Sequence, residues 1–145
     1  LARALSHAHG LGVLHRDLKP ANVLLRASDG APLLVDFGLA RLVEGAESLT
    51  RTGEVLGTPT HMSPEQAAGD RRRVDARSDV WGLGATLYHL LAGRPPFEGG
   101  TLVSILAAVL KGAPEPLRAL RPEVPPALEA IVLRCLTRDP AGRYP

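Results

Sequence analysis

The sequence predicts a mainly helical fold of the α+β type, in which small β-hairpin structure presents a polar loop. Two patterns favour this class. Apolar residues between positions 75 and 136 recur at the spacing of helices. Between positions 23 and 35, two short apolar runs instead flank Asp29 and Gly30, which is the pattern of two strands joined by a turn. We therefore expect one helical domain with a small hairpin near its N-terminal end.

The composition is that of a single globular domain. Of the 145 residues, 45% are hydrophobic, which is enough for a real core. Lys and Arg number 17 and Asp and Glu 15, so the formal net charge of +2 gives no reason to expect a nucleic acid or a membrane surface as a partner. No apolar run reaches the ~18 residues of a membrane span. The single Cys135 excludes an internal disulfide and fits a reducing compartment, so we expect a cytoplasmic domain, with any membrane anchor elsewhere in a longer protein.

A helix is expected at the start of the chain, and the hairpin follows it. Over residues 1–9, apolar side chains recur at i, i+3, i+4 and i+7, and Gly10 and Gly12 then end the helix. The strands of the hairpin are expected at 23–25 and 33–35. Folding this hairpin returns the end of the second strand to the start of the first.

Three longer helices should form the C-terminal half of the domain. Apolar residues wrap the whole circumference of 75–92, which marks a buried central helix. Gly82 and Gly84 are unfavourable within that helix, so close packing should compensate for them. Two amphipathic helices follow, with apolar stripes over 102–110 and 128–136.

The chemistry is concentrated in the stretch 15–22, which reads His-Arg-Asp-Leu-Lys-Pro-Ala-Asn. Magnesium prefers hard oxygen ligands completed by substrate phosphates, and Asn22 and Asp36, brought together by the hairpin, supply two such oxygens. Asp17 is a separate carboxylate that can orient an acceptor hydroxyl and take its proton. Lys19 lies on the same side of an extended loop and can steady a migrating phosphoryl group. These residue types point to phosphoryl transfer.

Three motifs in a fixed order resemble one family. The stretch 15–22, the Asp-Phe-Gly triplet at 36–38 and the Ser-Pro-Glu triplet at 63–65 are similar to the C-terminal lobe of a eukaryotic-like Ser/Thr protein kinase of bacterial type, over residues 1–145. The resemblance implies ATP and Mg²⁺ as cofactors and Ser or Thr hydroxyls of proteins as acceptors. It implies catalytic roles for Asp17, Lys19, Asn22 and Thr58, cofactor contacts from Lys19, Asn22, Leu24 and Asp36, and metal ligation by Asn22 and Asp36. For Leu24, a place in the strand core explains the residue equally well.

The resemblance also implies structural or regulatory roles for His15, Arg16, Phe37, Gly38, Thr50, Thr52, Glu65, Asp79 and Arg143. Arg16 is the family's receptor for a phosphate on the loop 39–62, which lacks periodicity, and our hypothesis is phosphorylation at Thr50 or Thr52. An ordinary solvated polar loop is the alternative. Asp79 would brace the backbone near Arg16, or would only interact with the helix dipole. Glu65 and Arg143 would form a buried ion pair.

Two residues depart from the family pattern. His61 stands where Tyr is usual, which leaves the shape of the substrate-peptide pocket open, and Ser63 replaces the commoner Ala. The histidines have no Cys or His partner at ligand spacing, so we interpret them as structural or solvated rather than as metal ligands: His7, His9, His61 and His89. Cys135 lies on an apolar stripe and should be a core residue.

No Gly-rich phosphate loop and no nucleotide-pairing strand lysine occurs in the sequence. In the family these lie upstream, in the N-terminal lobe. We therefore expect the chain, which begins with Leu and ends soon after Arg143, to be part of a longer kinase and to have little activity by itself. The alternative is a non-catalytic remnant of the lobe that serves as a protein-binding module.

Overall fold

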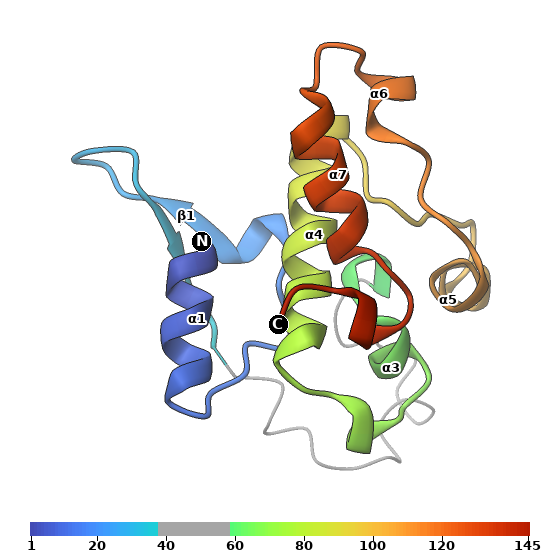
Figure 1. Cartoon of the computed structure of the whole chain (residues 1–145), viewed down its shortest axis with the longest axis horizontal. Coiled ribbons are helices and arrows are strands. Elements are labelled where there is room, and N and C mark those ends of the chain that lie inside the picture. The colour runs from blue at the N-terminus through green and yellow to red at the C-terminus, as the bar shows by residue number, and fades with distance from the viewer. Residues whose placement is uncertain (38–58) are drawn as a thin grey trace.

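The computed structural model describes residues 1–37 and 59–145, and these are mainly helical (Figure 1). The α-helices are α1 (Ala2–Gly10), α3 (Pro64–Ala67), α4 (Ala76–Ala92), α5 (Leu102–Lys111), α6 (Leu117–Leu120) and α7 (Pro126–Cys135). Four short 3₁₀ helices accompany them: η1 (Pro20–Asn22), η3 (Pro59–His61), η4 (Arg71–Arg73) and η5 (Pro140–Gly142). None of the described helices is both long and apolar enough to cross a bilayer. The predicted mainly helical fold is confirmed.

The helix α4 runs through the centre of the molecule, with α7 along one side of it (Figure 1). Its N-terminus is capped by the side chain of Asp75, and Gly93 ends it in the left-handed conformation at φ 78°. Its inner face carries Trp81, Ala85 and Tyr88, each at most 1% exposed. The prediction of a central buried helix is confirmed for this face. It is wrong at one position, because Leu90 lies roughly 200° around the helix from Tyr88 and is 57% exposed.

The two glycines of α4 mark its closest contacts with other parts of the chain. A Cβ atom on Gly82 would lie 2.9 Å from the Cβ of Leu18, in the loop that follows α1. A Cβ atom on Gly84 would overlap the Cβ of Cys135 in α7. The predicted close packing is therefore present at both positions, and it brings the loop 15–22 directly against the central helix.

The remaining helices cover the C-terminal side of the core. α5 begins with a capping box between Thr101 and Ser104, and Val109 is its fully buried residue. α7 begins at Pro126 and buries Val132 and Cys135. The stretch between α5 and α7 contains the one-turn helix α6, whose side chains join the core. Along α7 the predicted apolar stripe is wrong at one position, since Ile131 lies at the edge of the stripe and is 45% exposed.

The predicted hairpin is confirmed, and it projects beside α1 on the side of the molecule away from α5 and α6 (Figure 1). Strands β1 (Val23–Leu25) and β2 (Pro32–Leu34) pair antiparallel. The second strand begins one residue earlier than predicted. Gly30 takes φ 68° in the turn. The strand-core interpretation of Leu24 is wrong, because this residue is 51% exposed on the outer surface of a sheet that has only two described strands.

Candidate active site

The loop 15–22 is fixed to the central helix by one buried carboxylate. Asp79, which is 2% exposed, lies in the first turn of α4. Its Oδ2 accepts a hydrogen bond from the backbone N–H of His15 at 2.8 Å, and its Oδ1 accepts one from the N–H of Arg16 at 2.7 Å. The geometry is that of the backbone brace expected from the sequence, and it goes beyond an interaction with the helix dipole.

A third group, the ring of His9, bonds to the same carboxylate, and the sequence did not predict this contact. Nε2 of His9, in α1, lies 2.8 Å from Oδ2 of Asp79. His9 is therefore a structural residue and not a solvated one. The sequence held a weak signal, since His9 is four residues after the buried Leu5 and so lies on the inward face of α1. Periodicity alone could not name its partner, which is 70 residues away.

His15 connects the loop to the end of the hairpin. Its side chain is fully buried, and Nε2 lies 3.0 Å from the carbonyl oxygen of Val35. Its ring also stacks at a tilt on Phe37, with the centroids 4.6 Å apart. His15 and Phe37, both expected to be structural, are thus in contact. The contact ties the start of the loop to the segment that carries Asp36.

Three of the predicted catalytic residues come together around one carboxylate. Nζ of Lys19 lies 2.7 Å from Oδ2 of Asp17. Nδ2 of Asn22 donates to the backbone carbonyl of Asp17 at 2.7 Å and to its Oδ2 at 3.1 Å. The side chain of Asp17 remains 43% exposed, so an acceptor group can reach it from solvent. The short pair with Lys19 is a charge-assisted hydrogen bond that holds the Asp17 carboxylate in a defined orientation.

The predicted magnesium ligands lie on neighbouring strand ends. The backbone N–H of Val35 donates to the carbonyl of Asn22 at 3.1 Å, and Asp36 follows directly as an exposed residue. The amide nitrogen of Asn22 is occupied by Asp17, which leaves its amide oxygen as the donor of the kind that Mg²⁺ prefers. Over 1–37 and 59–145, no group of three or more His, Cys, Asp or Glu residues is suited to hold a metal. One amide oxygen and one carboxylate are hard donors of the kind that Mg²⁺ takes when phosphate oxygens complete its coordination.

Backbone strain is concentrated in the same place. Arg16 and Asp36 have φ angles of 66° and 62°, and they are the non-glycine residues with positive φ in the described part of the chain. Such conformations are disfavoured by roughly 1–3 kcal/mol and persist where surrounding contacts enforce them. Nε of Arg16 is buried without a hydrogen-bond partner among the described residues. A half-buried guanidinium with one donor not used by the described residues is compatible with the predicted receptor for a phosphate.

Four predicted site residues lie outside the described residues: Gly38, Thr50, Thr52 and Thr58.

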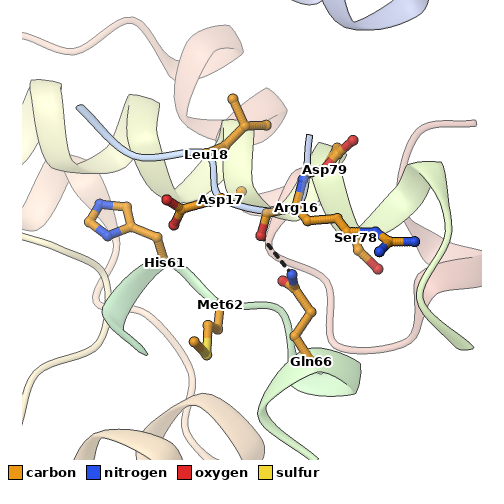
Figure 2. Close-up of a pocket in the computed structure, with 9 residues that line it drawn as sticks. Arg16, Asp17, Leu18, His61, Met62, Gln66, Ser78 and Asp79 are labelled. Carbon is orange, nitrogen blue, oxygen red and sulfur yellow. Dashed lines mark hydrogen bonds between the residues drawn. The ribbon is translucent and has the colours of Figure 1, made fainter. Parts of the chain in front are cut away.

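His61 lies next to Asp17, where both line a cavity of about 20 Å³ (Figure 2). Its Nε2 is 3.2 Å from Nδ1 of His89 in α4, and the two rings stack with centroids 5.3 Å apart. Its Nδ1 is 3.0 Å from the hydroxyl of Thr60. Burial, then His89 and Lys19, lower the pKa of His61 to about 4, while Asp17 acts in the opposite direction. His61 is thus a neutral, structural histidine at neutral pH.

We expect this histidine to make the domain less stable in acid. The pKa of His61 is about 4 in the folded state against 6.5 for the free side chain, so the unfolded state binds the extra proton between these values. The contribution of His61 to the free energy of unfolding does not change above pH 6.5. It falls as the pH drops towards 4, by roughly 3 kcal/mol in total. Urea unfolding at pH 7, 6, 5 and 4 should show this loss, and His61→Gln should lack it. The exposed His7 provides the control: His7→Gln should keep the wild-type pH dependence, and equal slopes for all three proteins would contradict the assignment.

A buried ion pair joins α3 to the C-terminal end of the chain. Nη1 of Arg143 lies 2.8 Å from Oε1 of Glu65, and Nη2 lies 3.0 Å from Oε2. The two side chains are 0% and 2% exposed. Ser78 donates a further hydrogen bond of 2.6 Å to Glu65. Burial alone would raise the pKa of Glu65, but the hydrogen bonds from Arg143 and Ser78 outweigh it and lower that pKa.

Comparison with known proteins gives matches over almost the whole chain. The model of the protein kinase domain family matches residues 1–145. The serine/threonine-protein kinase PknB of Mycobacterium tuberculosis is 42% identical over 143 residues, which are 98% of this chain and 22% of that protein. A probable serine/threonine-protein kinase of Streptomyces coelicolor is 41% identical over 145 residues (99% and 21%), and the DNA damage-responsive serine/threonine-protein kinase RqkA of Deinococcus radiodurans is 48% identical over 145 residues (99% and 21%). The chain spans about a fifth of the length of these relatives.

Proposed function

The chain belongs to the protein kinase family, and on this premise we propose that it carries the catalytic loop of a Ser/Thr protein kinase. The reaction is transfer of the γ-phosphoryl group of ATP to Ser or Thr hydroxyls of proteins. The observation that supports it most is the cluster in which Lys19 and Asn22 both bond to Asp17. A carboxylate held beside a cation and an amide is the arrangement that positioning of a phosphoryl acceptor requires.

The residues of the proposed site have separate tasks. Asp17 orients the acceptor hydroxyl and accepts its proton, and Lys19 steadies the phosphoryl group as it moves. Asn22 and Asp36 hold Mg²⁺, which neutralises charge on the triphosphate when it is bound. Leu24, whose side chain is exposed, is available to form the floor of the adenine pocket. Thr58 is proposed to hydrogen-bond Asp17 and Lys19 and to favour hydroxyl substrates.

The part that cradles the nucleotide phosphates is proposed to come from another segment of a longer polypeptide. The 145 residues contain no Gly-rich phosphate motif, and the relatives are about five times longer. The hairpin beside the site exposes Leu24, Leu25 and Leu33, at 51%, 72% and 39%. Covering this apolar surface is favourable, so residues 1–145 act as one lobe of a two-lobe domain. ATP as a substrate and the single reduced Cys135 favour a cytoplasmic location for it.

We expect the full-length protein, incubated with ATP and Mg²⁺, to phosphorylate itself and a general protein substrate such as casein. Mass spectrometry should find the phosphate on Ser and Thr, with Thr50 or Thr52 among the sites in the chain itself. A phosphate there would pair with Arg16 and order the loop around it. Chelation of the metal should stop the reaction. A folded full-length protein without phosphotransfer would overturn the proposal and favour the protein-binding alternative.

A further inference from the structure

We propose that Gln66 is a positioning residue for Asp17, acting through the peptide bond between Arg16 and Asp17. This inference rests on the proposed kinase function, in which Asp17 is the proton acceptor. Nε2 of Gln66, in α3, donates to the backbone carbonyl of Arg16 at 2.8 Å (Figure 2). The bond joins residues 50 positions apart in the sequence. No motif in the sequence assigns a task to this side chain.

Gln66 donates to the backbone carbonyl of Arg16, and this carbonyl belongs to the peptide bond that sets the position of Asp17. Arg16 has φ 66°, a conformation that a residue other than glycine adopts only when neighbouring groups enforce it. Its N–H is held by Oδ1 of Asp79 at 2.7 Å, and its carbonyl is held by Gln66. Because the peptide bond is planar, fixing the carbonyl of Arg16 also fixes the N–H and Cα of Asp17. Gln66 and Asp79 thus clamp the strained residue from both sides, just before the catalytic carboxylate.

The other end of the Gln66 amide is anchored independently. Its Oε1 accepts from the backbone N–H of Ser63 at 3.0 Å and from the Ser63 hydroxyl at 3.1 Å. The Ser63 hydroxyl in turn accepts from the backbone N–H of Gln66 at 3.4 Å, which completes a capping box. Ser63, where the family more often has Ala, is fully buried. This box sets the Gln66 side chain in the orientation that aims Nε2 at Arg16.

Substitution can test the roles of the two ends of the Gln66 amide separately. Gln66→Glu keeps an acceptor for Ser63 but removes the N–H that donates to Arg16. We expect kcat to fall by about 10²-fold, since a misplacement of about 1 Å near the chemistry has an effect of this size. The KM for ATP should stay within about twofold, because Asn22 and Asp36 are not moved directly. Gln66→Met places no charge against the Arg16 carbonyl and should show the same loss of kcat if Gln66→Glu does not fold.

Thr101→Ala is the matched control, because it breaks the other described capping box, at the start of α5, where the Thr101 hydroxyl accepts from the backbone N–H of Ser104. It should lower the midpoint of thermal unfolding and leave kcat unchanged. Hydrogen–deuterium exchange of the full-length protein gives a readout independent of activity: amides of 15–17 should exchange faster in the Gln66 variants than in Thr101→Ala. If the wild type has no phosphotransfer, the proposed function fails. The exchange data still test whether Gln66 holds the backbone of residues 15–17 in place. The proposal that Gln66 positions Asp17 would be overturned if both Gln66 variants had the exchange rates of the wild type at 15–17 and also its kcat.

Discussion

Replacing Asp17 with Asn is expected to reduce kcat for phosphoryl transfer by about 10²–10⁴-fold, the usual contribution of a positioned general base. Asn has the same size, and its side-chain oxygen can still accept from Lys19. It cannot take a proton at neutral pH, and it no longer carries the charge that orients Lys19 at 2.7 Å. The hydrogen bond from Asn22 to the backbone carbonyl of residue 17 should persist, so the loop keeps its shape. The measurement is steady-state kinetics of the full-length protein with a peptide substrate.

The matched control for this variant is another acidic residue that is exposed and paired. Asp29 lies in the hairpin turn, where its carboxylate is 3.2 Å from Arg26. Asp29→Asn should leave kcat and both KM values unchanged, because this pair is about half exposed and distant from the reaction. Thermal unfolding of both variants should match the wild type within a few degrees. If Asp17→Asn retained kcat within tenfold of the wild type, the proton acceptor would have to be a different group.

The loop 15–22 could be predicted from the sequence because its chemistry is local. Asp17, Lys19 and Asn22 lie within six consecutive residues, and a turn of the backbone is enough to bring them together. The hairpin pattern also allowed the position of Asp36 to be predicted, since pairing of 23–25 with the second strand brings the chain back to Asn22. The shift of that strand to begin at Pro32 has a simple cause. Pro lacks an N–H but is tolerated on an edge strand, and among the described residues both strands of this sheet are edges.

Contacts across long sequence distances could not be found from periodicity. The bond from His9 to Asp79 and the bond from Gln66 to Arg16 join parts of the chain that no local pattern relates. The exposure of Leu24 and Leu90 has a similar origin. An apolar pattern shows which side chains can be buried, but the arrangement of the other elements decides which of them are covered.

The central helix explains why the strained loop keeps its conformation. One face of α4 provides Asp79 for the loop backbone and Gly82 for its close approach, and the helix is in turn fixed by α7 at Gly84. Ser78, next to Asp79, bonds to Glu65 and so joins the same helix to α3, where Gln66 holds Arg16. The reactive loop is therefore supported by rigid helices on two sides. The buried ion pair between Glu65 and Arg143 joins this frame to the C-terminal end of the chain.

Arg143→Ala should accordingly lower the free energy of unfolding by about 3–5 kcal/mol, as the loss of one partner of a buried ion pair does. Glu65 would be left as an unpaired buried charge, with only the bond from Ser78. Arg143 also donates to the backbone carbonyls of Arg77 and Arg138, so these acceptors would lose their partner as well. Urea unfolding at pH 7 provides the measurement. The control is Arg94→Ala, which breaks pairs with two half-exposed glutamates and should change the free energy of unfolding far less than Arg143→Ala does, because solvent screens exposed pairs.

The charge on Glu65 gives this prediction a second, independent readout. The pKa of Glu65 is lowered in the folded state, so its pairing stabilises the fold above its unfolded pKa, and the gain is lost as the pH falls through the folded value. Arg143→Ala removes the partner and should remove this part of the acid sensitivity. The double variant Glu65→Met with Arg143→Met should recover much of the stability at pH 7, because no unpaired charge then remains buried. If Arg143→Ala cost no more stability than Arg94→Ala, or if the double variant were less stable than Arg143→Ala, an unpaired buried charge on Glu65 would not be the cause of the lost stability.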